Sequence, residues 1–526
     1  MGRFLNIGND RYEAFSKTKY FIDKTRMLNV LLEKDADEKF ICSSRPRRFG
    51  KSVTANMMTA YFSRGADSRS LFEPLKCTKD ALFLSSMNQY DTIFVDIQAQ
   101  FVTAAAIGTD PSQYISKSVV RELKEAYPEW IQEEMALNTA LGIINHETGN
   151  QFVIIFDEWD YPVRELGLES KERSAYIDFL RVLFKSSDAM SYIRLAYLTG
   201  ILPMVRAKGQ SAVNNFHEYT MIRPKDLGEF TGFTEEEVAW LCERYHADFQ
   251  KMKEWYNGYN INGRPVYNPL SVVRAVAEKD FGQFWTETGT YEDIGELINR
   301  DFDGLREAVI EMLSGNRIPV NVTGCKNDMH TFTDKNQVIT TLIHLGYFAY
   351  DKAEQEAYLP NKEIQEVFYK YLENDTGDNL SLFMKLSEEI TAAVLTMDED
   401  KTAALVQQVH NDFISSIEYN DENSLSCTIT VALLALFKYY HKPVREFPCG
   451  KGFADIVYLP LAKYPNRPVI VVELKWNKSA AAAVAQIKER SYPASLQEYS
   501  GEILLVGITY DKKTKEHQCR MESFLK

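Results

Sequence analysis

The sequence has few cysteines, no long apolar stretch and no excess of positive charge. Its seven cysteines are scattered without CxxC spacing, which argues against a disulfide framework or a zinc site and favours reduced thiols in a cytoplasm. The longest apolar run, Thr430–Phe437, is far too short to span a bilayer. The first residues lack the apolar core of a secretory signal peptide, so none is expected. We therefore expect a cytoplasmic protein with no membrane segment.

The net charge of −14 argues against an electrostatic grip on nucleic acid by the whole molecule. The charge is unevenly distributed, however. Residues 441–526 contain 14 Lys and Arg against 9 Asp and Glu, a balance of +5, so the remainder carries −19. If nucleic acid is a partner, the sequence predicts that the basic C-terminal part binds it. The 526 residues are enough for about three or four domains.

The stretch Lys39–Ser52, KFICSSRPRRFGKS, has the order of strand, tight loop and helix that a phosphate-binding loop requires. In such a loop the backbone N–H groups face an anion, the lysine reaches the β- and γ-phosphates, and the hydroxyl holds Mg²⁺. The pattern GxxxxGK[ST] is degenerate here, because Arg45 stands at its first glycine. A surface turn with a chance GKS is the alternative. The predicted nucleotide-binding residues are Arg45, Pro46, Arg47, Arg48, Phe49, Gly50, Lys51 and Ser52, with Ser52 also a metal ligand.

A second apolar strand, residues 152–156, ends in the acidic pair Asp157 and Glu158. We expect Asp157 to lie by the Mg²⁺, directly or through a water, and Glu158 to be the catalytic carboxylate that polarises the attacking water. A buried strand that ends in a polar turn is the alternative. Both halves of an ATPase would rarely occur together by chance, so the sequence favours ATP and Mg²⁺ as cofactors.

Further strands are expected at 91–98 and 192–199, with helices at 114–145 and 176–184. Strands that alternate with helices are typical of a parallel α/β sheet, in which ligands bind at the carboxyl ends of the strands. Thr199 closes the last of these strands and is predicted to sense the γ-phosphate. A threonine that merely ends a strand explains the pattern equally well.

From Gly232 the character of the sequence changes. A Thr followed three residues later by Glu forms a capping-box pattern at 234–237, and the reading stays mostly helical to about residue 400, with a small winged or mixed segment near 336–350. The predicted domains are 1–230, the P-loop domain; 231–400, a helical lid and middle region; and 401–526, an αβ domain.

Asp455, Glu473 and Lys475 carry the chemistry of the C-terminal part. The two acids are expected on adjacent strands of a hairpin, where their carboxylates converge, and Glu473 and Lys475 share a face because they are two residues apart. Two carboxylates can bind one or two Mg²⁺ that polarise a phosphodiester, while the lysine positions or deprotonates the water. A surface Glu–Lys pair on a hairpin is the alternative, because ExK alone is a weak signal.

The N-terminal part resembles the AAA-ATPase-like family, close to the archaeal-type P-loop ATPases, over roughly residues 5–280. The resemblance implies an ASCE-type P-loop fold with a parallel sheet and a helical lid. The motifs that carry it are YFIDKT (20–25), RPRRFGKS (45–52), FVIIFDEWD (152–160), LTG (198–200), EWYNGY (254–259) and VYNPLSV (266–272).

The last hundred residues resemble the PD-(D/E)XK nuclease superfamily. The matching positions are Glu422, Asp455, Glu473 and Lys475, with Gln486 and Tyr492 as an accessory QxxxxxY feature. The resemblance implies a restriction-endonuclease-like αβ core in which Glu422, Asp455 and Glu473 hold the metal. It also makes the 401–526 domain a nuclease-like one; the resemblance implies no settled biological role, and nucleic-acid processing or defence is inferred from the nuclease fold.

Together these patterns predict an α/β protein that binds ATP and cuts DNA or RNA. The expected activity is an ATPase joined to an Mg²⁺-dependent, ATP-regulated nuclease. One alternative is a nucleotide-dependent switch or binding module whose nuclease-like domain is inactive; another is a plain ATPase with a structural C-terminal domain. P-loop ATPases often assemble and share an arginine across subunits, so a homo-oligomer is also considered.

Overall fold

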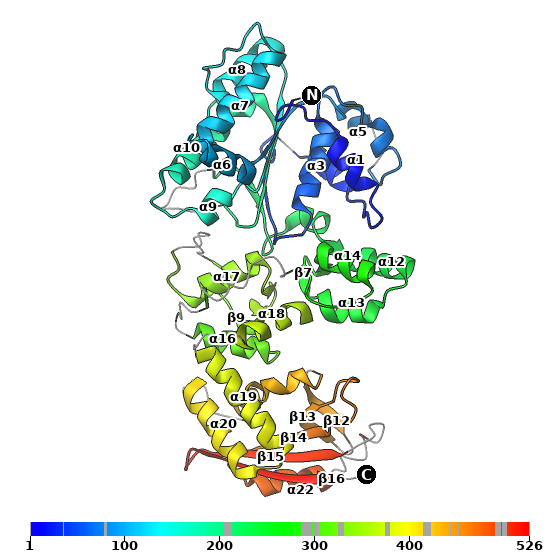
Figure 1. Ribbon diagram of the computed structural model, residues 1–526, viewed down its shortest axis with the longest axis vertical. Coiled ribbons are helices and arrows are strands. Elements are labelled where there is room, and N and C mark those ends of the chain that lie inside the picture. The colour runs from blue at the N-terminus through cyan, green and yellow to red at the C-terminus, as the bar shows by residue number, and fades with distance from the viewer. Residues whose placement is uncertain are drawn as a thin grey trace. The chain divides into compact units, whose positions relative to one another are not determined.

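The computed structural model divides the chain into two compact units (Figure 1). The first comprises Met1–Thr290 and Pro319–Ile364, and the second comprises Tyr291–Ile318 and Gln365–Lys526. This division does not test the three predicted domain ranges, which stay a prediction. The structure describes residues 2–34, 36–77, 81–204, 213–285, 297–298, 302, 304–323, 331–373, 379–413, 422–441, 443–449, 452–489, 496 and 502–524.

A five-stranded, wholly parallel sheet organises the first unit, in the order β2-β3-β4-β1-β5. Its register places Asp96 beside Asp157, Asp157 beside Thr199, and Thr199 beside Ser43. The carboxyl ends of four neighbouring strands thus form one row of polar side chains. The strands are β1 (Phe40–Ser44), β2 (Asp91–Asp96), β3 (Phe152–Asp157), β4 (Ile193–Gly200) and β5 (His217–Tyr219).

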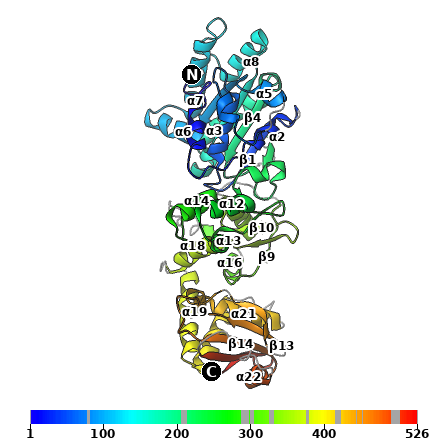
Figure 2. The ribbon, with the colours of Figure 1, turned by 90° about the vertical axis from the view of Figure 1, so that its right-hand side faces the viewer.

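Helices cover both faces of this sheet, as Figures 1 and 2 show. One buried cluster joins the strands to α1, α2, α3 and α5, and a second joins them to α6, α7, α8 and α10. Burial on both faces explains why the strands are continuous apolar runs. The helices are α1 (Asp10–Ser16), α2 (Arg26–Leu32), α3 (Lys51–Phe62), α4 (Arg69–Phe72), α5 (Ala81–Ser86), α6 (Ile97–Ala106), α7 (Pro111–Ala126), α8 (Leu137–Thr148), α9 (Tyr161–Glu165), α10 (Lys171–Lys185), α11 (Ala189–Tyr192) and the 3-10 helix η1 (Lys225–Phe230).

The rest of the first unit is a helical region with short strands. The predicted capping box is confirmed at the start of α12, where Thr234 and Glu237 each accept a backbone N–H from the other. Asn268 caps α14, and Pro269 occupies its first turn. The elements are β6 (Phe233–Thr234), α12 (Glu235–Tyr245), α13 (Phe249–Tyr256), β7 (Tyr259–Ile261), β8 (Arg264–Tyr267), α14 (Pro269–Glu278), α17 (Lys335–Leu345), β10 (Ala349–Asp351) and β11 (Glu356–Tyr358).

The second unit contains a mixed sheet in the order β12-β13-β14-β15-β16, in which only β14 and β15 are parallel. Helix α22 packs against β14, β15 and β16, and α21 packs against β14. The strands are β12 (Val444–Cys449), β13 (Gly452–Tyr458), β14 (Val469–Trp476), β15 (Ile503–Asp511) and β16 (Glu516–Phe524). The helices are α16 (Leu305–Leu313), α19 (Asn379–Leu395), α20 (Glu399–Phe413), α21 (Glu422–Ala432), η2 (Leu434–Lys438) and α22 (Ala480–Glu489). Two elements, β9 (Ile318–Pro319) and α18 (Lys362–Glu373), cross the boundary between the units.

The predicted fold class is confirmed, and the differences are local. The helices expected over 114–145 are α7 and α8, which are separate because the chain leaves the helical path after Ala126, just before Pro128. Strands β5, β12 and β16 were not predicted, since β5 has three residues and the other two carry charged residues along exposed edges. No helix in the described part of the chain is long and apolar enough to cross a membrane. The five cysteines with described side chains form no disulfide with one another.

Candidate nucleotide and metal sites

The loop between β1 and α3 makes the tight turn that the sequence predicts. Arg48 and Gly50 both have positive φ values, 68° and 88°. Glycine adopts this conformation freely, whereas an arginine there is uncommon and costs energy. The turn directs the chain into α3, which begins at Lys51, and the first N–H groups of a helix have no acceptor within it.

Lys51 is buried and is held by the loop that it follows. Its Nζ donates to the carbonyl oxygens of Arg45 at 3.1 Å and Pro46 at 3.0 Å. Burial lowers the pKa of this lysine, while the neighbouring carboxylates of Glu158 and Asp157 raise it. The ammonium therefore sits beside the acidic pair, as predicted, with two main-chain partners that a phosphate could replace.

Arg45, which replaces the first glycine of the motif, is built into the interior. Its Nε donates to Thr231 Oγ1 at 2.9 Å, and its Nη1 donates to the carbonyl oxygens of Ser44 and Tyr219 at 3.0 and 3.2 Å. Burial lowers the pKa of this guanidinium to about 10. The side chain thus fastens the loop to β5 and η1, and a nucleotide contact of Arg45 would have to come from its backbone.

Asp157 and Glu158 stand where β3 ends. A hydrogen bond from the Ser52 hydroxyl stabilises the Asp157 carboxylate, but burial dominates and raises its pKa to about 6. Asp157 Oδ1 also accepts the backbone N–H of Glu158 at 3.1 Å, and Glu158 has a φ of 53°. Ser52 and Asp157, as one hydroxyl and one carboxylate, form an oxygen donor set of the kind that Mg²⁺ prefers.

Thr199 lies at the end of β4, as predicted, between Asp157 and Ser43 in the register of the sheet. The residue is fully buried, and its Oγ1 has no hydrogen-bond partner among the described residues. Buried hydroxyls are usually paired, so an unpaired one at a strand end fits a ligand or a water. Its contact with a γ-phosphate stays a prediction.

A cavity of about 820 Å³ opens beside the loop. Residues Arg47–Ser52 line it, as do Glu158 and an N-terminal segment around Tyr20 and Phe21. Further apolar walls come from Phe230, Phe233, Pro269, Leu270 and Val273. The volume and the aromatic lining suit a nucleoside. The sequence singles out the YFIDKT segment only as a motif of the family resemblance, and its place in the cavity wall was not predicted.

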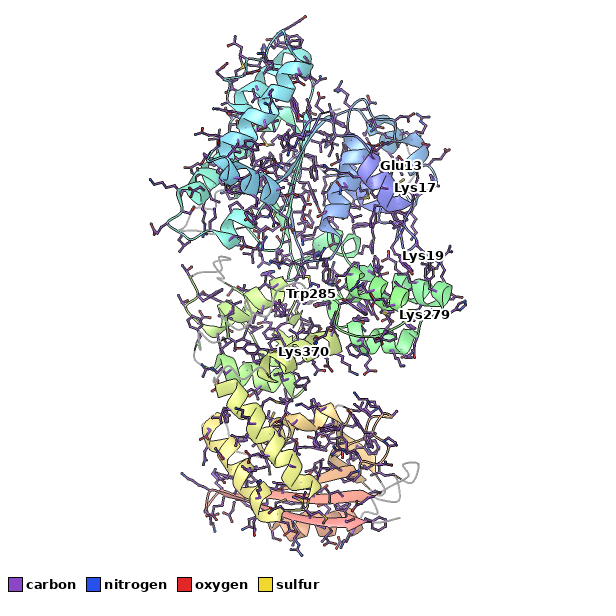
Figure 3. The ribbon with its side chains drawn as sticks, viewed as in Figure 1. Glu13, Lys17, Lys19, Lys279, Trp285 and Lys370 are labelled. Atoms are coloured by element: carbon purple, nitrogen blue, oxygen red, sulfur yellow. The ribbon has the colours of Figure 1, made fainter. Side chains whose placement is uncertain are left out.

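The helical region braces the outer side of the loop. The indole of Trp285 (Figure 3) donates to the carbonyl oxygen of Arg47 at 3.0 Å. The rings of Tyr259 and Phe49 pack edge to face, with 5.5 Å between their centroids. A Cβ atom at Gly346 would lie 2.8 Å from Pro46 Cβ, so the backbone there approaches the loop closely. The contact of Tyr259 with Phe49 gives the last residue of the EWYNGY motif a structural role beside the loop.

The second predicted site lies on the mixed sheet of the other unit. β13 and β14 are antiparallel, as the hairpin prediction required. Asp455 Oδ2 accepts the backbone N–H of Leu474 at 2.7 Å, which places this carboxylate next to Glu473. Lys475 Nζ donates to Glu473 Oε1 at 3.0 Å and to the carbonyl oxygen of Leu474 at 2.9 Å. Asp455, Glu473 and Lys475 are therefore brought together.

Helix α22 adds a fourth group to this site. Gln486 Nε2 donates to Glu473 Oε1. The helix can approach because Gly507 stands opposite Glu473 on β15. A Cβ atom there would meet the carbonyl oxygen of Ala480 at 2.5 Å. Sequence reasoning found Gln486 but not Gly507, because the close approach depends on strand register.

Two predicted residues of this site fall outside the description. Tyr492 is not among the described residues, and only the backbone of Glu422 is described, at the start of α21. Among the side chains that are described, no group of three or more His, Cys, Asp and Glu could hold a metal ion. The described carboxylates that could contribute ligands are those of Asp455 and Glu473, and Mg²⁺ is often held by one or two carboxylates.

Comparisons with known proteins agree with this arrangement. Residues 6–208 match the family model described as "Predicted AAA-ATPase", and residues 420–519 match that of the PD-(D/E)XK nuclease superfamily. A curated relative, the "Uncharacterized protein in vnfD 5'region" of Azotobacter chroococcum mcd 1, is 26% identical over 297 residues, which cover 53% of this chain and 52% of the relative. The chain thus spans about half the length of this relative.

Two solved structures show weak likeness. The ORC2 protein of Aeropyrum pernix, with ADPNP and ADP, has 11% identity and a TM-score of 0.29, covering 70% of this chain and 99% of its own. Cdc6p of Pyrobaculum aerophilum has 10% identity and a TM-score of 0.20, covering 66% and 92%. Likenesses this weak add nothing to the fold described above. The two family matches do: residues 6–208 form an AAA-ATPase-like domain, and residues 420–519 form a domain of the PD-(D/E)XK nuclease superfamily.

Proposed function

We propose that this protein is an ATP-regulated, Mg²⁺-dependent nuclease that acts on DNA or RNA, in nucleic-acid processing or defence. The observation that carries the proposal is the arrangement around Glu473. Its carboxylate accepts hydrogen bonds from Lys475 and Gln486, and Asp455 lies on the adjacent strand. A surface Glu–Lys pair would not bury the glutamate, yet Glu473 is fully buried.

In the nuclease-like site, Asp455 and Glu473 would hold Mg²⁺. The metal would polarise the scissile phosphodiester and lower the pKa of a bound water. Lys475 lies beside the carboxylate and can position that water, while Gln486 fixes the orientation of Glu473. The positive balance of residues 441–526 supports binding of the nucleic-acid backbone by this part of the chain.

In the ATPase-like site, Lys51 and the first turn of α3 would bind the β- and γ-phosphates, and Ser52 and Asp157 would hold Mg²⁺. The aromatic side of the cavity would receive the base, with Tyr20 and Phe21 among its walls. Glu158 would orient the attacking water and accept its proton. The ATP-regulated part of the proposal follows from the presence of both domains in one chain.

A specific observation favours a second candidate, a nucleotide-dependent switch with an inactive nuclease-like domain. Glu473 Oε1 accepts from both Lys475 and Gln486, so a metal must compete with two existing donors. Such a domain could hold nucleic acid without cutting it. The two candidates differ in one measurable property, cleavage in the presence of a divalent cation.

The test is a cleavage assay of the full chain on single- and double-stranded DNA and RNA, with Mg²⁺ or Mn²⁺ and with a chelator. Wild-type protein should cut at least one substrate, and Glu473→Ala should not. Glu489→Ala is a matched control, since Glu489 lies on the exposed side of the same helix as Gln486. Equal activity of wild type and Glu473→Ala would rule out the nuclease, and nucleic-acid binding without cleavage would favour the switch.

A further inference from the structure

Arg164, on the short helix after the acidic pair, is surrounded by carboxylates. Its side chain is 8% exposed. Nη2 lies 3.1 Å from Glu158 Oε2, Nε lies 3.2 Å from Asp160 Oδ2, and Nη1 lies 3.0 Å from Glu165 Oε1. One guanidinium thus pairs with three acids. One of them is Glu158, the carboxylate proposed to orient the attacking water in ATP hydrolysis.

The three ion pairs of Arg164 differ in how easily a ligand can replace them. Asp160 is fully buried, and its Oδ2 also accepts the backbone N–H groups of Ile201 and Leu202 at 3.0 and 2.8 Å. Glu165 is 47% exposed, so its pair with Arg164 is weakened by solvent. Glu158 is 25% exposed and faces the cavity. The pair with Glu158 is therefore the one that a ligand in the cavity can exchange.

Arg164 also lies within electrostatic reach of the phosphate loop. It lines the same cavity as Lys51 and Ser52, and its charge lowers the pKa of Lys51. A γ-phosphate bound by Lys51 would bring several acceptor oxygens into this space. Phosphate is a strong, bidentate partner for a guanidinium, because the planar fork matches two of its oxygens.

We infer that Arg164 is a catalytic cation for the γ-phosphate, supplied by the same chain, and that it pairs with Glu158 while the site is empty. This inference rests on the proposed ATPase function. When ATP binds, the guanidinium turns from Glu158 to the γ-phosphate. The same movement frees Glu158 and adds a positive charge where negative charge develops.

The freed carboxylate then has a defined task. The water oxygen forms a bond to the γ-phosphorus, the bond to the bridging oxygen of the β-phosphate breaks, and Glu158 takes the proton of the water. The products are ADP and inorganic phosphate, and Arg164 neutralises charge on the transferred group throughout. No arginine from a second subunit is needed in this scheme, in contrast to an arginine shared across an oligomer.

The test separates turnover from binding. ATP hydrolysis at saturating Mg²⁺-ATP and the Kd for the nucleotide are measured for wild type, Arg164→Ala, Arg164→Lys and the control Arg181→Ala. Arg181 pairs with Asp178 on the exposed surface of α10. Arg164→Ala should lower kcat by at least about 100-fold, with Kd within about threefold of wild type. Arg164→Lys should recover part of kcat, and Arg181→Ala should match wild type. If Arg164→Ala fails to fold, the lysine variant carries the test, with normal Kd and reduced kcat expected.

A mixing experiment tests whether the arginine acts within one chain. Arg164→Ala protein is mixed with Lys51→Ala protein, which keeps Arg164 but should not bind ATP well. The mixture should hydrolyse no faster than its two components together; recovery of activity would show an arginine acting between chains and would overturn the inference. An Arg164→Ala kcat equal to or above wild type would also overturn it. If wild type itself hydrolyses no ATP, the proposed ATPase function fails first, and the inference falls with it.

Discussion

The two candidate sites differ in where their polar residues lie and in what holds the lysine of each site. In the parallel sheet, the residues stand at strand ends and in the following loop, and Lys51 is held by main-chain carbonyls. In the mixed sheet, the carboxylates project from within strands, and Lys475 is held by Glu473 itself. A ligand at the first site must displace only backbone contacts of the lysine. A metal at the second must compete with the lysine for its own carboxylate, so we expect the second site to need a higher metal concentration for half-maximal binding.

The strongest test of whether the two sites carry separate activities is a substitution that disables one site alone. Asp455→Asn should lower nucleic-acid cleavage by about a thousandfold or more, since loss of a metal carboxylate removes several kcal/mol of transition-state stabilisation. ATP hydrolysis should stay at the wild-type rate. Both activities are measured on the same preparation. Loss of ATP hydrolysis in Asp455→Asn would show that the sites are not chemically separate.

The converse variant is Lys51→Ala. Removal of the buried ammonium should weaken nucleotide binding by about 10- to 100-fold, because charge-assisted hydrogen bonds to the phosphates are each worth about 1.5–3 kcal/mol. Isothermal calorimetry with Mg²⁺-ATP measures this change. Lys124→Ala, on the exposed surface of α7, is the matched control. Unchanged affinity in Lys51→Ala would remove the loop from the nucleotide site.

Glu158→Gln distinguishes binding from turnover within the first site. The amide keeps the shape of the side chain but cannot take a proton, so hydrolysis should slow by about 100-fold while binding is retained. The measurement pairs single-turnover hydrolysis with calorimetry. A variant that hydrolyses at the wild-type rate would contradict the role given to Glu158.

The raised pKa of Asp157 gives the first site a pH dependence. Because the folded-state pKa is about 6 and the unfolded value is near 4, the folded state holds more protons in this window, and its stability falls as the pH rises through it. Mg²⁺ needs the carboxylate, so the affinity for Mg²⁺-nucleotide should change in the opposite direction, falling about tenfold per unit below pH 6. The measurement is nucleotide affinity as a function of pH, with and without Mg²⁺. In Asp157→Asn, the gain in affinity from Mg²⁺ should no longer change with pH. If that gain falls below pH 6 equally in wild type and Asp157→Asn, the assignment of Asp157 is contradicted.

The smallest expected effect concerns the approach of α22 to the second site. A methyl group at Gly507 would meet the carbonyl oxygen of Ala480, so Gly507→Ala should lower the free energy of unfolding by about 1–3 kcal/mol. It should also reduce cleavage severalfold by moving Gln486 away from Glu473. Gly167→Ala serves as a comparison, because a Cβ atom there has nothing within 4 Å and Gly167 is not among the glycines with positive φ. If Gly507→Ala cleaves nucleic acid at the wild-type rate, the role given to Gln486 in orienting Glu473 is contradicted.

The sequence predicted the site residues that lie close together along the chain. The loop to Ser52, the pair Asp157–Glu158 and the hairpin acids could be predicted because each motif lies in a short segment next to a strand. The interior position of the Arg45 guanidinium could not, because it depends on Tyr219 and Thr231, far along the chain. The same holds for the cavity wall and for Arg164, whose role depends on where a helix places it relative to the acidic pair.

The central claim is that nucleotide at the first site controls cleavage at the second. The most direct measurement is the rate of nucleic-acid cleavage by the full chain with and without ATP, in wild type and in Lys51→Ala, at fixed Mg²⁺. We predict that ATP changes the wild-type rate at least severalfold and leaves the Lys51→Ala rate unchanged. An identical rate with and without ATP in the wild type, or the same response in both proteins, would contradict the account.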